Sequence, residues 1–288
     1  MIYLGNLKNK LIGFIYNSAI SETSFFIKDL MNKLNYDKEN SWCTSLDQLS
    51  QFENEFSKTS LVVIVGGDGS ILKTVRYIYN YSIPMIGINF GQIGFMTELD
   101  PNEAINKLPE YINGEIRIEE RMTLEAAVFS GIEENPKLTF NALNDVVIGQ
   151  GGVSKLSDIE VSVDDHVLTT YRSDAVVVST ATGSTGYSYS AGGPILHPES
   201  NEIILQPVAP HTGLRDSIVL PKDSKVTLRP TNKNTTIVSA DGVSEIQLDI
   251  HDKLIIKSGR YPAKFLRSLS TISFYNTLAN KLGLFNKT

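Results

Sequence analysis

The chain has very few residues of the kinds that build disulfide frameworks or metal clusters. Cys43 is the only cysteine among 288 residues, so neither an internal disulfide nor a cysteine-based metal cluster can form. The four histidines do not have the spacing of metal ligands, and we interpret them as structural residues: His166, His197, His211 and His251. The sequence therefore excludes a disulfide-stapled domain, and its single cysteine suits a reducing cytosol.

A basic excess and a long apolar run are also absent. Lys and Arg number 26 against 32 Asp and Glu, a net charge of −6, which argues against a nucleic-acid partner. No stretch approaches the roughly 18 apolar residues of a membrane-spanning helix, and Met1–Tyr16 lacks a signal-peptide pattern. We therefore expect a cytoplasmic protein with no membrane partner. The length and a hydrophobic content of 41% are sufficient for two domains with separate cores.

The first third of the chain alternates between strand and helix patterns. Apolar runs predict buried parallel strands over 11–16, 61–65 and 83–89, and apolar residues at helical spacing predict helices between them. A further helix is predicted after Asp100, with Asp100 as its N-cap and Glu103 placed to complete a capping box. This alternation predicts a Rossmann-like α/β domain, a parallel sheet with helices on both faces.

After about residue 115 the pattern changes to short strands separated by turns. The sequence shows no long helical pattern between 115 and 265, which predicts an antiparallel β-sandwich. The segment 271–284 is helical again and is expected to pack back on the first domain. We therefore predict an α/β domain over 1–115 together with 268–288, and a β-sandwich domain over 116–267. The predicted strands are 122–129, 138–148, 156–163, 174–180, 203–207, 225–229, 235–239 and 253–257.

A glycine-rich loop, Gly66–Ser70 (GGDGS), connects the strand predicted over 61–65 to the following helix. Ligands of open α/β sheets bind at the carboxyl ends of strands. Glycines let a phosphate approach the backbone, and a helix N-terminus offers free N–H groups to an anion. Asp68 adds a carboxylate that could accept a proton from a hydroxyl or hold Mg²⁺; the alternative is a tight turn with an N-cap aspartate. The loop is not a Walker A loop, because the chain has no Gly-Lys pair, and it lacks the third glycine of a dinucleotide fingerprint.

Two further segments bring small polar residues to the ends of strands. Gly91–Phe95 follows the strand predicted over 83–89 and would line the same edge as Gly66–Ser70. Thr182–Pro194 (TGSTGYSYSAGGP) presents hydroxyl and backbone groups with little bulk, which suits contact with adenine, ribose or phosphate. The alternative for each segment is an ordinary connecting loop.

Two acidic dipeptides are weaker signals. Asn144-Asp145 precedes a predicted strand, and a neighbouring amide and carboxylate can bind vicinal ribose hydroxyls. Asp241-Gly242 is a common turn pair. Taken as isolated dipeptides, both are more typical of turns than of binding sites.

Together these motifs resemble the NAD kinase family over nearly the whole chain, from Val62 to about Leu284. The Gly66–Ser70 motif is shared with lipid kinases of the diacylglycerol type and with phosphofructokinases, whereas Thr182–Pro194 is specific to NAD kinases. The resemblance implies an α/β domain, a β-sandwich and a returning C-terminal helix. It also implies a phosphotransferase that moves the γ-phosphoryl group of Mg-ATP to the 2′-hydroxyl of the adenosine ribose of NAD, in a homodimer or homotetramer whose sites are shared between subunits.

The resemblance assigns a role to each motif position. Asp68 is expected to be the general base, with Mg²⁺ arriving with ATP rather than at a fixed protein site. Asp174 matches a residue near the nicotinamide, and Asp241 matches an acidic residue near the phosphates. The residues expected to bind NAD are Gly69, Phe95, Asn144, Asp145, Arg172, Asp174, Thr182, Thr185, Tyr187 and Ser190. The residues expected to bind ATP or its phosphates are Gly66, Gly67, Gly69, Ser70, Ser184 and Asp241.

Three positions depart from the family pattern. Asp145 stands where the family usually has Glu, Ser173-Asp174-Ala175 replaces Gly-Asp-Gly, and Gly186 replaces Ala. The acids themselves remain, so activity is expected. Two other functions compete with this one. A lipid kinase would share the glycine loop but would need an apolar acceptor groove, and an inactive relative would bind the dinucleotide as a sensor.

Overall fold

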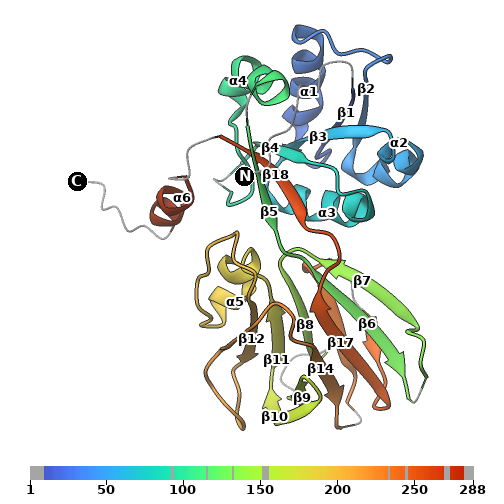
Figure 1. The fold of residues 1–288 in the computed structure, drawn as a ribbon, viewed down its shortest axis with the longest axis vertical. Coiled ribbons are helices and arrows are strands. Elements are labelled where there is room, and N and C mark those ends of the chain that lie inside the picture. Colours follow the sequence, from blue (N-terminus) through green and yellow to red (C-terminus); the bar gives the residue numbers. More distant parts are fainter. Residues whose placement is uncertain are drawn as a thin grey trace. The chain divides into compact units, whose positions relative to one another are not determined.

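The computed structural model of the chain describes residues 10–91, 94–114, 116–131, 133–150, 156–232, 234–243, 246–268 and 273–281. The chain forms two compact units, and each has its own hydrophobic core (Figure 1). The first unit is Met1–Glu120 together with Ala263–Thr288, and the second is Arg121–Pro262. Within the described part of the chain, no helix is both long and apolar enough to span a membrane.

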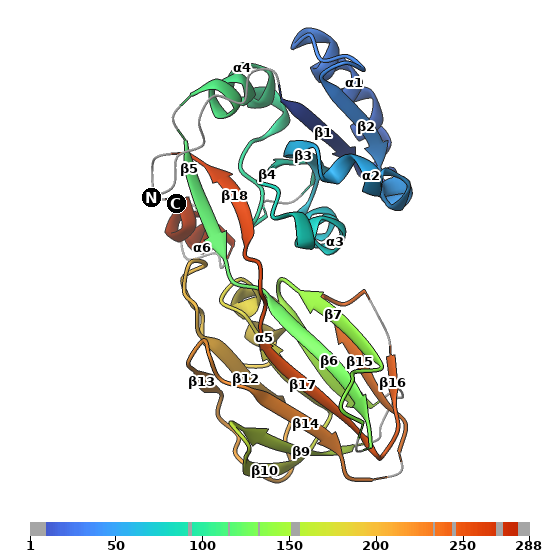
Figure 2. The same cartoon turned by 45° about the vertical axis from the view of Figure 1, so that its right-hand side comes forward.

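The first unit is built on one six-stranded sheet of order β2-β1-β3-β4-β18-β5. The strands from β2 to β4 pair in parallel, and β18 is parallel to β4. β5 runs in the opposite direction to β18, so the sheet is mixed (Figure 2). The strands are β1 (Leu11–Tyr16), β2 (Ser41–Ser45), β3 (Thr59–Gly66), β4 (Met85–Asn89), β5 (Arg117–Arg121) and β18 (Ala263–Arg267).

Helices cover both faces of this sheet. Buried residues of α1 and α4 share one apolar core with the strands, whereas α3 lies on the opposite face (Figures 1 and 2). This arrangement confirms the predicted α/β class. The helices are α1 (Ser21–Lys33), α2 (Glu53–Phe56), α3 (Asp68–Ile78), α4 (Pro101–Asn113) and α6 (Ser273–Lys281), with short 3-10 helices η1 (Leu46–Phe52) and η2 (Tyr79–Tyr81).

The start of α4 illustrates how local sequence sets an element boundary. The Asp100 carboxylate accepts hydrogen bonds from the N–H groups of Asn102 (2.8 Å) and Glu103 (3.1 Å), as expected of an N-cap. Pro101 occupies the first turn, where its missing N–H is not needed. Glu103, which was expected to complete a capping box, forms an ion pair with Lys107 at 2.6 Å.

The segment around Trp42 has no clear strand pattern in the sequence, yet it forms β2. Trp42 lies in β2, its ring is buried and stacks on Phe52 with centroids 5.2 Å apart, and its indole N–H donates to Thr59 Oγ1 at 2.9 Å. Polar residues between the apolar ones hide the strand pattern, because Ser41, Thr44 and Ser45 are themselves buried in the sheet.

The second unit is a β-sandwich, as predicted. Its two antiparallel six-stranded sheets have the orders β10-β9-β14-β17-β6-β7 and β13-β12-β11-β8-β15-β16. The strands are β6 (Leu124–Ser130), β7 (Leu138–Ala142), β8 (Asp145–Gln150), β9 (Ser157–Val163), β10 (His166–Ser173), β11 (Ala175–Ser179), β12 (Ile203–Val208), β13 (Ile218–Leu220), β14 (Val226–Pro230), β15 (Thr236–Ala240), β16 (Ile246–Leu248) and β17 (Asp252–Ser258), with η3 (Gly183–Thr185) and α5 (Tyr187–Ser190) after β11.

The inner faces of the two sheets form a single apolar core of Val, Ile, Leu and Ala side chains. Alternation along β6 and β17 buries every second residue, which is the pattern of a sheet with one face on a core.

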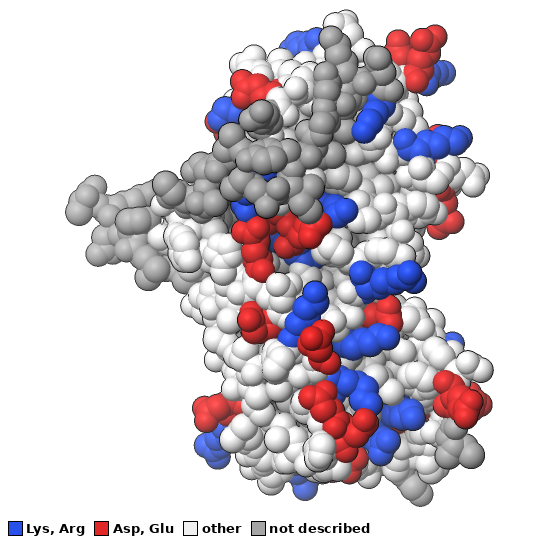
Figure 3. Space-filling view, in the orientation of Figure 1, with Lys and Arg blue, Asp and Glu red and all other residues white. Residues whose placement is uncertain are grey.

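On the surface shown in Figure 3, cationic and anionic side chains are interspersed rather than separated by sign. The sequence analysis assigned the whole range 116–267 to the sandwich domain. However, β5 and β18, which both lie within that range, pair within the sheet of the first unit.

Buried charges fasten the segment after β4 to the end of β18. The buried Arg267 guanidinium forms ion pairs with Glu98 (Nη1–Oε2 2.9 Å) and Glu119 (Nε–Oε1 3.2 Å). Arg267 Nη1 also donates to the Thr97 carbonyl oxygen at 3.3 Å. Because a buried charge is costly unless it is paired and hydrogen-bonded, all three side chains depend on one another.

Two more donors complete the environment of Glu98. Its Oε1 accepts from the Tyr111 hydroxyl at 2.7 Å and from the Ser268 N–H at 2.8 Å. Burial, together with the Glu98 carboxylate, raises the pKa of the Tyr111 hydroxyl, which therefore stays protonated and donates. We call Glu98, Tyr111, Glu119 and Arg267 the Arg267 network.

Removing the cation should destabilise the first unit strongly. In Arg267→Met, the buried Glu98 carboxylate loses its cation, while Glu119 keeps its ion pair with Arg117 (Nη2–Oε2 3.0 Å). We expect a loss of about 3–5 kcal/mol of unfolding free energy. The measurement is denaturant unfolding followed by the fluorescence of Trp42, the only tryptophan of the chain, which lies in this unit. The control is Lys33→Met, which removes an exposed Lys33–Asp29 pair (2.7 Å) and should cost at most about 1 kcal/mol. Equal losses in the two variants would contradict the prediction.

Candidate active site

The Asp68 carboxylate lies at the carboxyl end of β3, as the first residue of α3. Its two oxygens accept hydrogen bonds from consecutive backbone N–H groups, Oδ2 from Phe95 at 2.8 Å and Oδ1 from Met96 at 3.0 Å. The two predicted glycine segments therefore meet, since Phe95 and Met96 follow β4 and Asp68 follows the neighbouring strand. The carboxylate is half-buried and held in one orientation.

Gly94 has no room for a side chain. A Cβ at this position would lie 2.1 Å from Asp68 Oδ1, far inside van der Waals contact. The absence of a Cβ lets the backbone of the 94–96 segment approach the carboxylate closely enough to donate both hydrogen bonds. Phe95 is half-buried, and its ring centroid lies 6.3 Å from that of Phe274 in α6, which places this helix on the first unit.

The remaining residues of the Gly66–Ser70 loop divide into an open and a closed part. Cβ atoms built on Gly67 and Gly69 would meet no atom within 4 Å, so a ligand can approach the backbone there. Ser70, in contrast, is buried, and its Oγ accepts from Asn17 Nδ2 at 3.2 Å. A Cβ on Gly66 would lie 2.3 Å from Ser70 Oγ. Ser70 and Gly66 thus pack beneath the loop, while Gly67 and Gly69 form its open surface.

The second unit places Asn144 and Asp145 at a corner between β7 and β8. The Asp241 carboxylate accepts from three consecutive backbone N–H groups of this corner: Leu143 (2.9 Å), Asn144 (2.7 Å) and Asp145 (3.2 Å). Asp241 is buried, and its own N–H donates to the Asp145 carbonyl oxygen at 2.9 Å. The oxygens of Asp241 are therefore directed at backbone amides of the same unit.

The Thr182–Ser190 segment packs against this corner. A Cβ on Gly186 would lie 3.7 Å from Asn144 Nδ2 and 3.9 Å from Asp145 Oδ2, so both side chains are directed at the segment. Ser184 is buried and its Oγ donates to the Ala181 carbonyl oxygen at 2.6 Å, which gives it a structural position. The predicted residues on the outer side of the segment are Thr185, Tyr187 and Ser190, of which Tyr187 and Ser190 are exposed.

Two buried polar atoms at the corner have no hydrogen-bond partner within the described chain. They are Asn144 Oδ1 and Thr182 Oγ1. Buried polar atoms are rarely left unsatisfied, and here the two belong to residues that the sequence assigned to the nucleoside site. Their state favours a polar ligand as the missing partner.

Asp145 shares this corner with another acid. Burial first, and then the negative charge of Asp241, raise the pKa of the Asp145 carboxyl to about 7. A carboxyl group that is protonated at neutral pH can donate a hydrogen bond as well as accept one. The Asp145 side chain, which is shorter than the Glu expected at this position, is buried in the second unit.

Within one chain, Arg172 and Asp174 lie far from the corner formed by Asn144 and Asp145. Both are exposed and lie before β11, whereas Thr180 and Thr182 follow it. In the ladder with β8, Ala175 pairs with Gly149 and Ser179 pairs with Asp145. At ~3.3 Å per residue the two groups are therefore roughly 20 Å apart. The fold of one chain does not bring Arg172 and Asp174 to Asn144 and Asp145.

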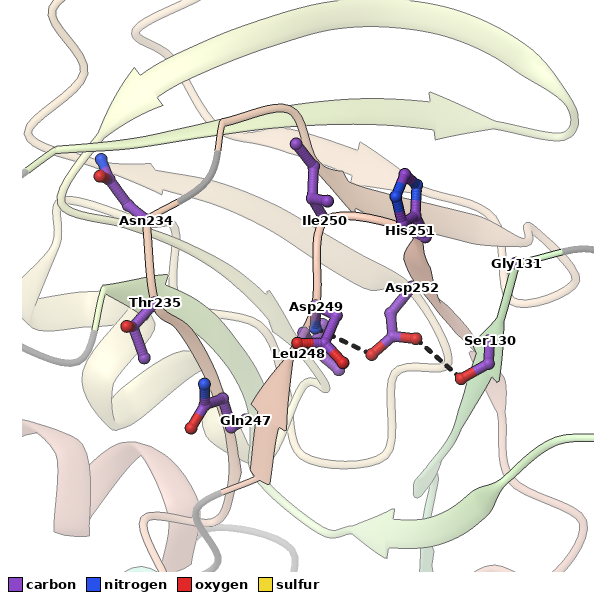
Figure 4. Close-up of a pocket in the computed structure, with 10 residues that line it drawn as sticks. All are labelled: Ser130, Gly131, Asn234, Thr235, Gln247, Leu248, Asp249, Ile250, His251 and Asp252. Carbon is purple, nitrogen blue, oxygen red and sulfur yellow. Dashed lines mark hydrogen bonds between the residues drawn. The ribbon is translucent and has the colours of Figure 1, made fainter.

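A cavity of about 430 Å³ in the second unit contains none of the predicted residues (Figure 4). Its most prominent polar group is Asp252, which accepts from Ser130 Oγ (2.9 Å), Lys137 Nζ (2.5 Å) and the Asp249 N–H (2.9 Å). Burial favours protonation of this carboxyl, but its hydrogen bonds outweigh burial and hold its pKa below the ordinary value. These contacts join the turns at one end of the sandwich, which explains the buried Asp252 carboxylate as a structural residue.

Models of two protein domains match the chain. The ATP-NAD kinase N-terminal domain matches residues 6–116, and the ATP-NAD kinase C-terminal domain matches residues 143–268. The NAD kinase of Dehalococcoides mccartyi is 37% identical over 273 residues, which cover 95% of this chain and 96% of that protein. The NAD kinase of Carboxydothermus hydrogenoformans is 37% identical over 82% of this chain and 83% of that protein.

The chain belongs to the NAD kinase family. As a member of it, the chain is an enzyme of the NAD kinase kind, a phosphotransferase. Two solved structures share the fold. Yeast NADH kinase complexed with NADH aligns with a TM-score of 0.85 and 20% identity. The alignment covers 97% of this chain and 88% of the yeast chain. An NAD kinase from Archaeoglobus fulgidus in complex with ATP aligns with a TM-score of 0.75 and 23% identity. The alignment covers 96% of this chain and 100% of that chain.

Three residues beside the NAD kinase motifs were missed by sequence reasoning. Asn17 and Asn89 lie at the carboxyl ends of β1 and β4, and this position after a predicted strand could have revealed them. Thr180 donates from Oγ1 to the Leu143 carbonyl oxygen at 2.6 Å and accepts from the Gly183 N–H at 3.1 Å. Its role depends on a contact across 37 residues, which no local pattern could have shown.

The Asp145 carboxyl should make stability depend on pH. Its folded pKa of about 7 lies above the ordinary 3.8, so the folded state binds the proton more tightly. Folding stability should therefore be lost as pH rises from about 4 to about 7, by at most about 4 kcal/mol. Asp145→Asn lacks this titration, so the difference in melting temperature between variant and wild type should increase over that range. A difference that stays constant from pH 4 to pH 8 would contradict the assignment.

Proposed function

We propose that this enzyme transfers the γ-phosphoryl group of Mg-ATP to the 2′-hydroxyl of the adenosine ribose of NAD, giving NADP. The observation that carries the proposal is the Asp68 carboxylate, which is fixed by two backbone N–H groups at the edge where the open glycine backbone begins. The two family models, which together span most of the chain, support this substrate pair.

Asp68 acts as the general base. Its two oxygens accept hydrogen bonds from the backbone N–H groups of Phe95 and Met96, which hold the carboxylate in one orientation. The ribose 2′-hydroxyl gives its proton to Asp68 as its oxygen bonds to the γ-phosphorus, and the bond from that phosphorus to the bridging oxygen of ADP breaks. Such phosphoryl transfers depend mainly on positioning and charge neutralisation, and the two hydrogen bonds supply the positioning of the base.

The open side of the glycine loop suits the donor phosphates. Gly67 and Gly69 leave the backbone unobstructed, and the N-terminus of α3 favours negative charge. A Mg²⁺ ion bound to ATP would neutralise charge on its phosphates. The residues fit such an ion, because Mg²⁺ binds through one or two carboxylates plus substrate phosphates and keeps several waters. Asp68 is the carboxylate nearest in sequence to the open glycines.

The adenosine half of NAD binds at the Asn144 corner. Asn144 and Asp145 contact the ribose hydroxyls, and Thr182, Thr185, Tyr187 and Ser190 line the adenosine site. The unpartnered atoms Asn144 Oδ1 and Thr182 Oγ1 supply two of the contacts. Buried polar groups that only the correct ligand can satisfy also give strong selectivity.

Arg172 and Asp174 serve the nicotinamide half from a neighbouring copy of the chain. Their separation from Asn144 by the length of β11 supports this, because one chain alone does not join the two groups. A homodimer or homotetramer satisfies this requirement. The single cysteine agrees with the reducing cytosol as the place of the reaction.

The test is an assay of the purified protein with Mg-ATP and NAD, in which an NADP-specific dehydrogenase reports the product. Asp68→Asn should lower kcat by about 10²–10⁴-fold, the usual contribution of a general base, with its circular dichroism spectrum unchanged. The control is Asp100→Asn, since Asp100 also accepts two backbone N–H groups at a helix start and Asn is an equally good N-cap. Its kcat should stay within twofold of wild type.

Other outcomes would point to other functions. Full kcat in Asp68→Asn would remove Asp68 as the base. NAD binding in a calorimeter without NADP formation would indicate a dinucleotide sensor, and phosphorylation of diacylglycerol in place of NAD would indicate a lipid kinase.

A further inference from the structure

Asp241 has an unusual backbone for its residue type. Its φ is +50°, in the left-handed region, and the next residue, Gly242, also has a positive φ of +67°. A left-handed conformation costs an ordinary residue roughly 1–2 kcal/mol, and Asp and Asn tolerate it best. The conformation turns the chain at the end of β15 so that the Asp241 carboxylate faces the Leu143–Asp145 backbone.

The three amides that it binds lie in a buried part of the corner. Leu143 is fully buried and Asp145 is 6% exposed, so water is a poor substitute for the carboxylate. Hydrogen bonds to an ionised acceptor are about twice as strong as neutral ones. One side chain therefore fixes three consecutive residues of the connection between β7 and β8.

The opposite side of the same connection is fixed by the strand end after β11. The Leu143 carbonyl oxygen accepts from Thr180 Oγ1 at 2.6 Å, and the Asn144 carbonyl oxygen accepts from the Thr180 N–H at 2.9 Å and Ser179 Oγ at 3.1 Å. The amides are thus held by Asp241 and the carbonyls by Ser179 and Thr180. With the backbone held on both sides, the side chains of Asn144 and Asp145 face Gly186.

We propose that Asp241 is a positioning residue for the dinucleotide, which acts by holding the Leu143–Asp145 backbone so that Asn144 and Asp145 face the nucleoside segment. This inference rests on the proposed function, because it assigns Asp241 to the NAD side of the reaction rather than to the ATP phosphates. Its negative charge beside the Asp145 carboxyl, which favours the protonated form of Asp145, is a second consequence of the same contact.

The chain contains a matched control for this contact. Asp164 also has a left-handed backbone, with φ +50°. Its Oδ1 accepts from the Lys225 N–H at 2.8 Å, and its own N–H donates to the Lys225 carbonyl oxygen at 3.0 Å, which repeats the exchange between Asp241 and Asp145. It lies in the turn between β9 and β10 of the same unit. Asp164→Asn therefore disturbs the same kind of contact at a position with no assigned ligand.

The experiment compares Asp241→Asn with Asp164→Asn in the NADP assay. An Asn at 241 keeps one acceptor oxygen but turns an NH₂ group towards one of the amides. We expect the KM for NAD to rise at least about tenfold in Asp241→Asn, as for loss of a hydrogen bond to a charged group, while the KM for ATP stays within twofold. Both constants should stay within twofold in Asp164→Asn. If Asp241→Asn is insoluble, Asp241→Ser retains an acceptor and should show the same division.

Two further measurements separate positioning from a general structural role. Amide hydrogen exchange should become faster in the peptide 138–148 of Asp241→Asn, without a change in the 157–173 peptide. Because Asp241 acts through Asn144, adding Asp241→Asn to Asn144→Ala should raise the KM for NAD by less than threefold, far from the product of the single effects.

A rise in the KM for ATP with an unchanged KM for NAD would overturn the inference and return Asp241 to the phosphates. Faster exchange with an unchanged KM for NAD would also overturn it, because the contact would then only stabilise the fold. If the wild type forms no NADP, the proposed function fails by itself. Calorimetric binding of NAD to wild type and Asp241→Asn then tests Asp241, and equal affinities would contradict its role.

Discussion

The Arg267 network is the constraint on which the first unit depends. It joins the 97–98 segment to β5, β18 and α4, and the preceding residues, 94–96, hold the carboxylate of Asp68. The N–H groups of Glu98 and Leu99 also donate to the Gly87 carbonyl oxygen in β4, at 2.9 and 3.2 Å. The segment 94–99, which contacts Asp68, is thus tied to three strands and a helix. Buried ion pairs often contribute little net stability because of desolvation, but here they fix the orientation of one carboxylate.

Asp68 in the first unit and Asp241 in the second accept the same pattern of backbone hydrogen bonds. Each is an acid whose oxygens accept consecutive backbone N–H groups. In each case residues distant in sequence supply the amides, 27 and 28 positions away for Asp68 and 96–98 for Asp241. The difference lies in exposure. Asp68 is half-buried beside open glycine backbone, whereas Asp241 is 8% exposed beneath the Asn144 corner. The same bonding therefore orients a reacting group in one case and the backbone of a binding site in the other.

The sequence was sufficient for the class of both units, because long apolar runs such as 61–65 and short alternating strands have periods that local residues determine. It also located the N-cap at Asp100 and the glycine loop. It missed β2, whose Ser and Thr side chains are buried by tertiary contacts, and it placed β18 in the sandwich, because a five-residue strand has no mark of the sheet that it joins. Motifs located Asp68, Asn144 and Asp145, but the partners of Asp241 and Thr180 are set by long-range pairing. Burial of Ser70 and Ser184 likewise followed from packing, which composition does not encode.

The position of β18 has a consequence for the order of events during synthesis. This strand lies between β4 and β5, yet its residues, 263–267, are made after the whole sandwich. On a ribosome that adds ~5–20 residues per second, β4 keeps an open edge until residues 263–267, which follow the whole sandwich, emerge. The sandwich, which is continuous from 121 to 262, can close first. An unpaired edge invites wrong pairing, so a truncation within the final strand should leave a folded sandwich attached to an aggregation-prone α/β remainder.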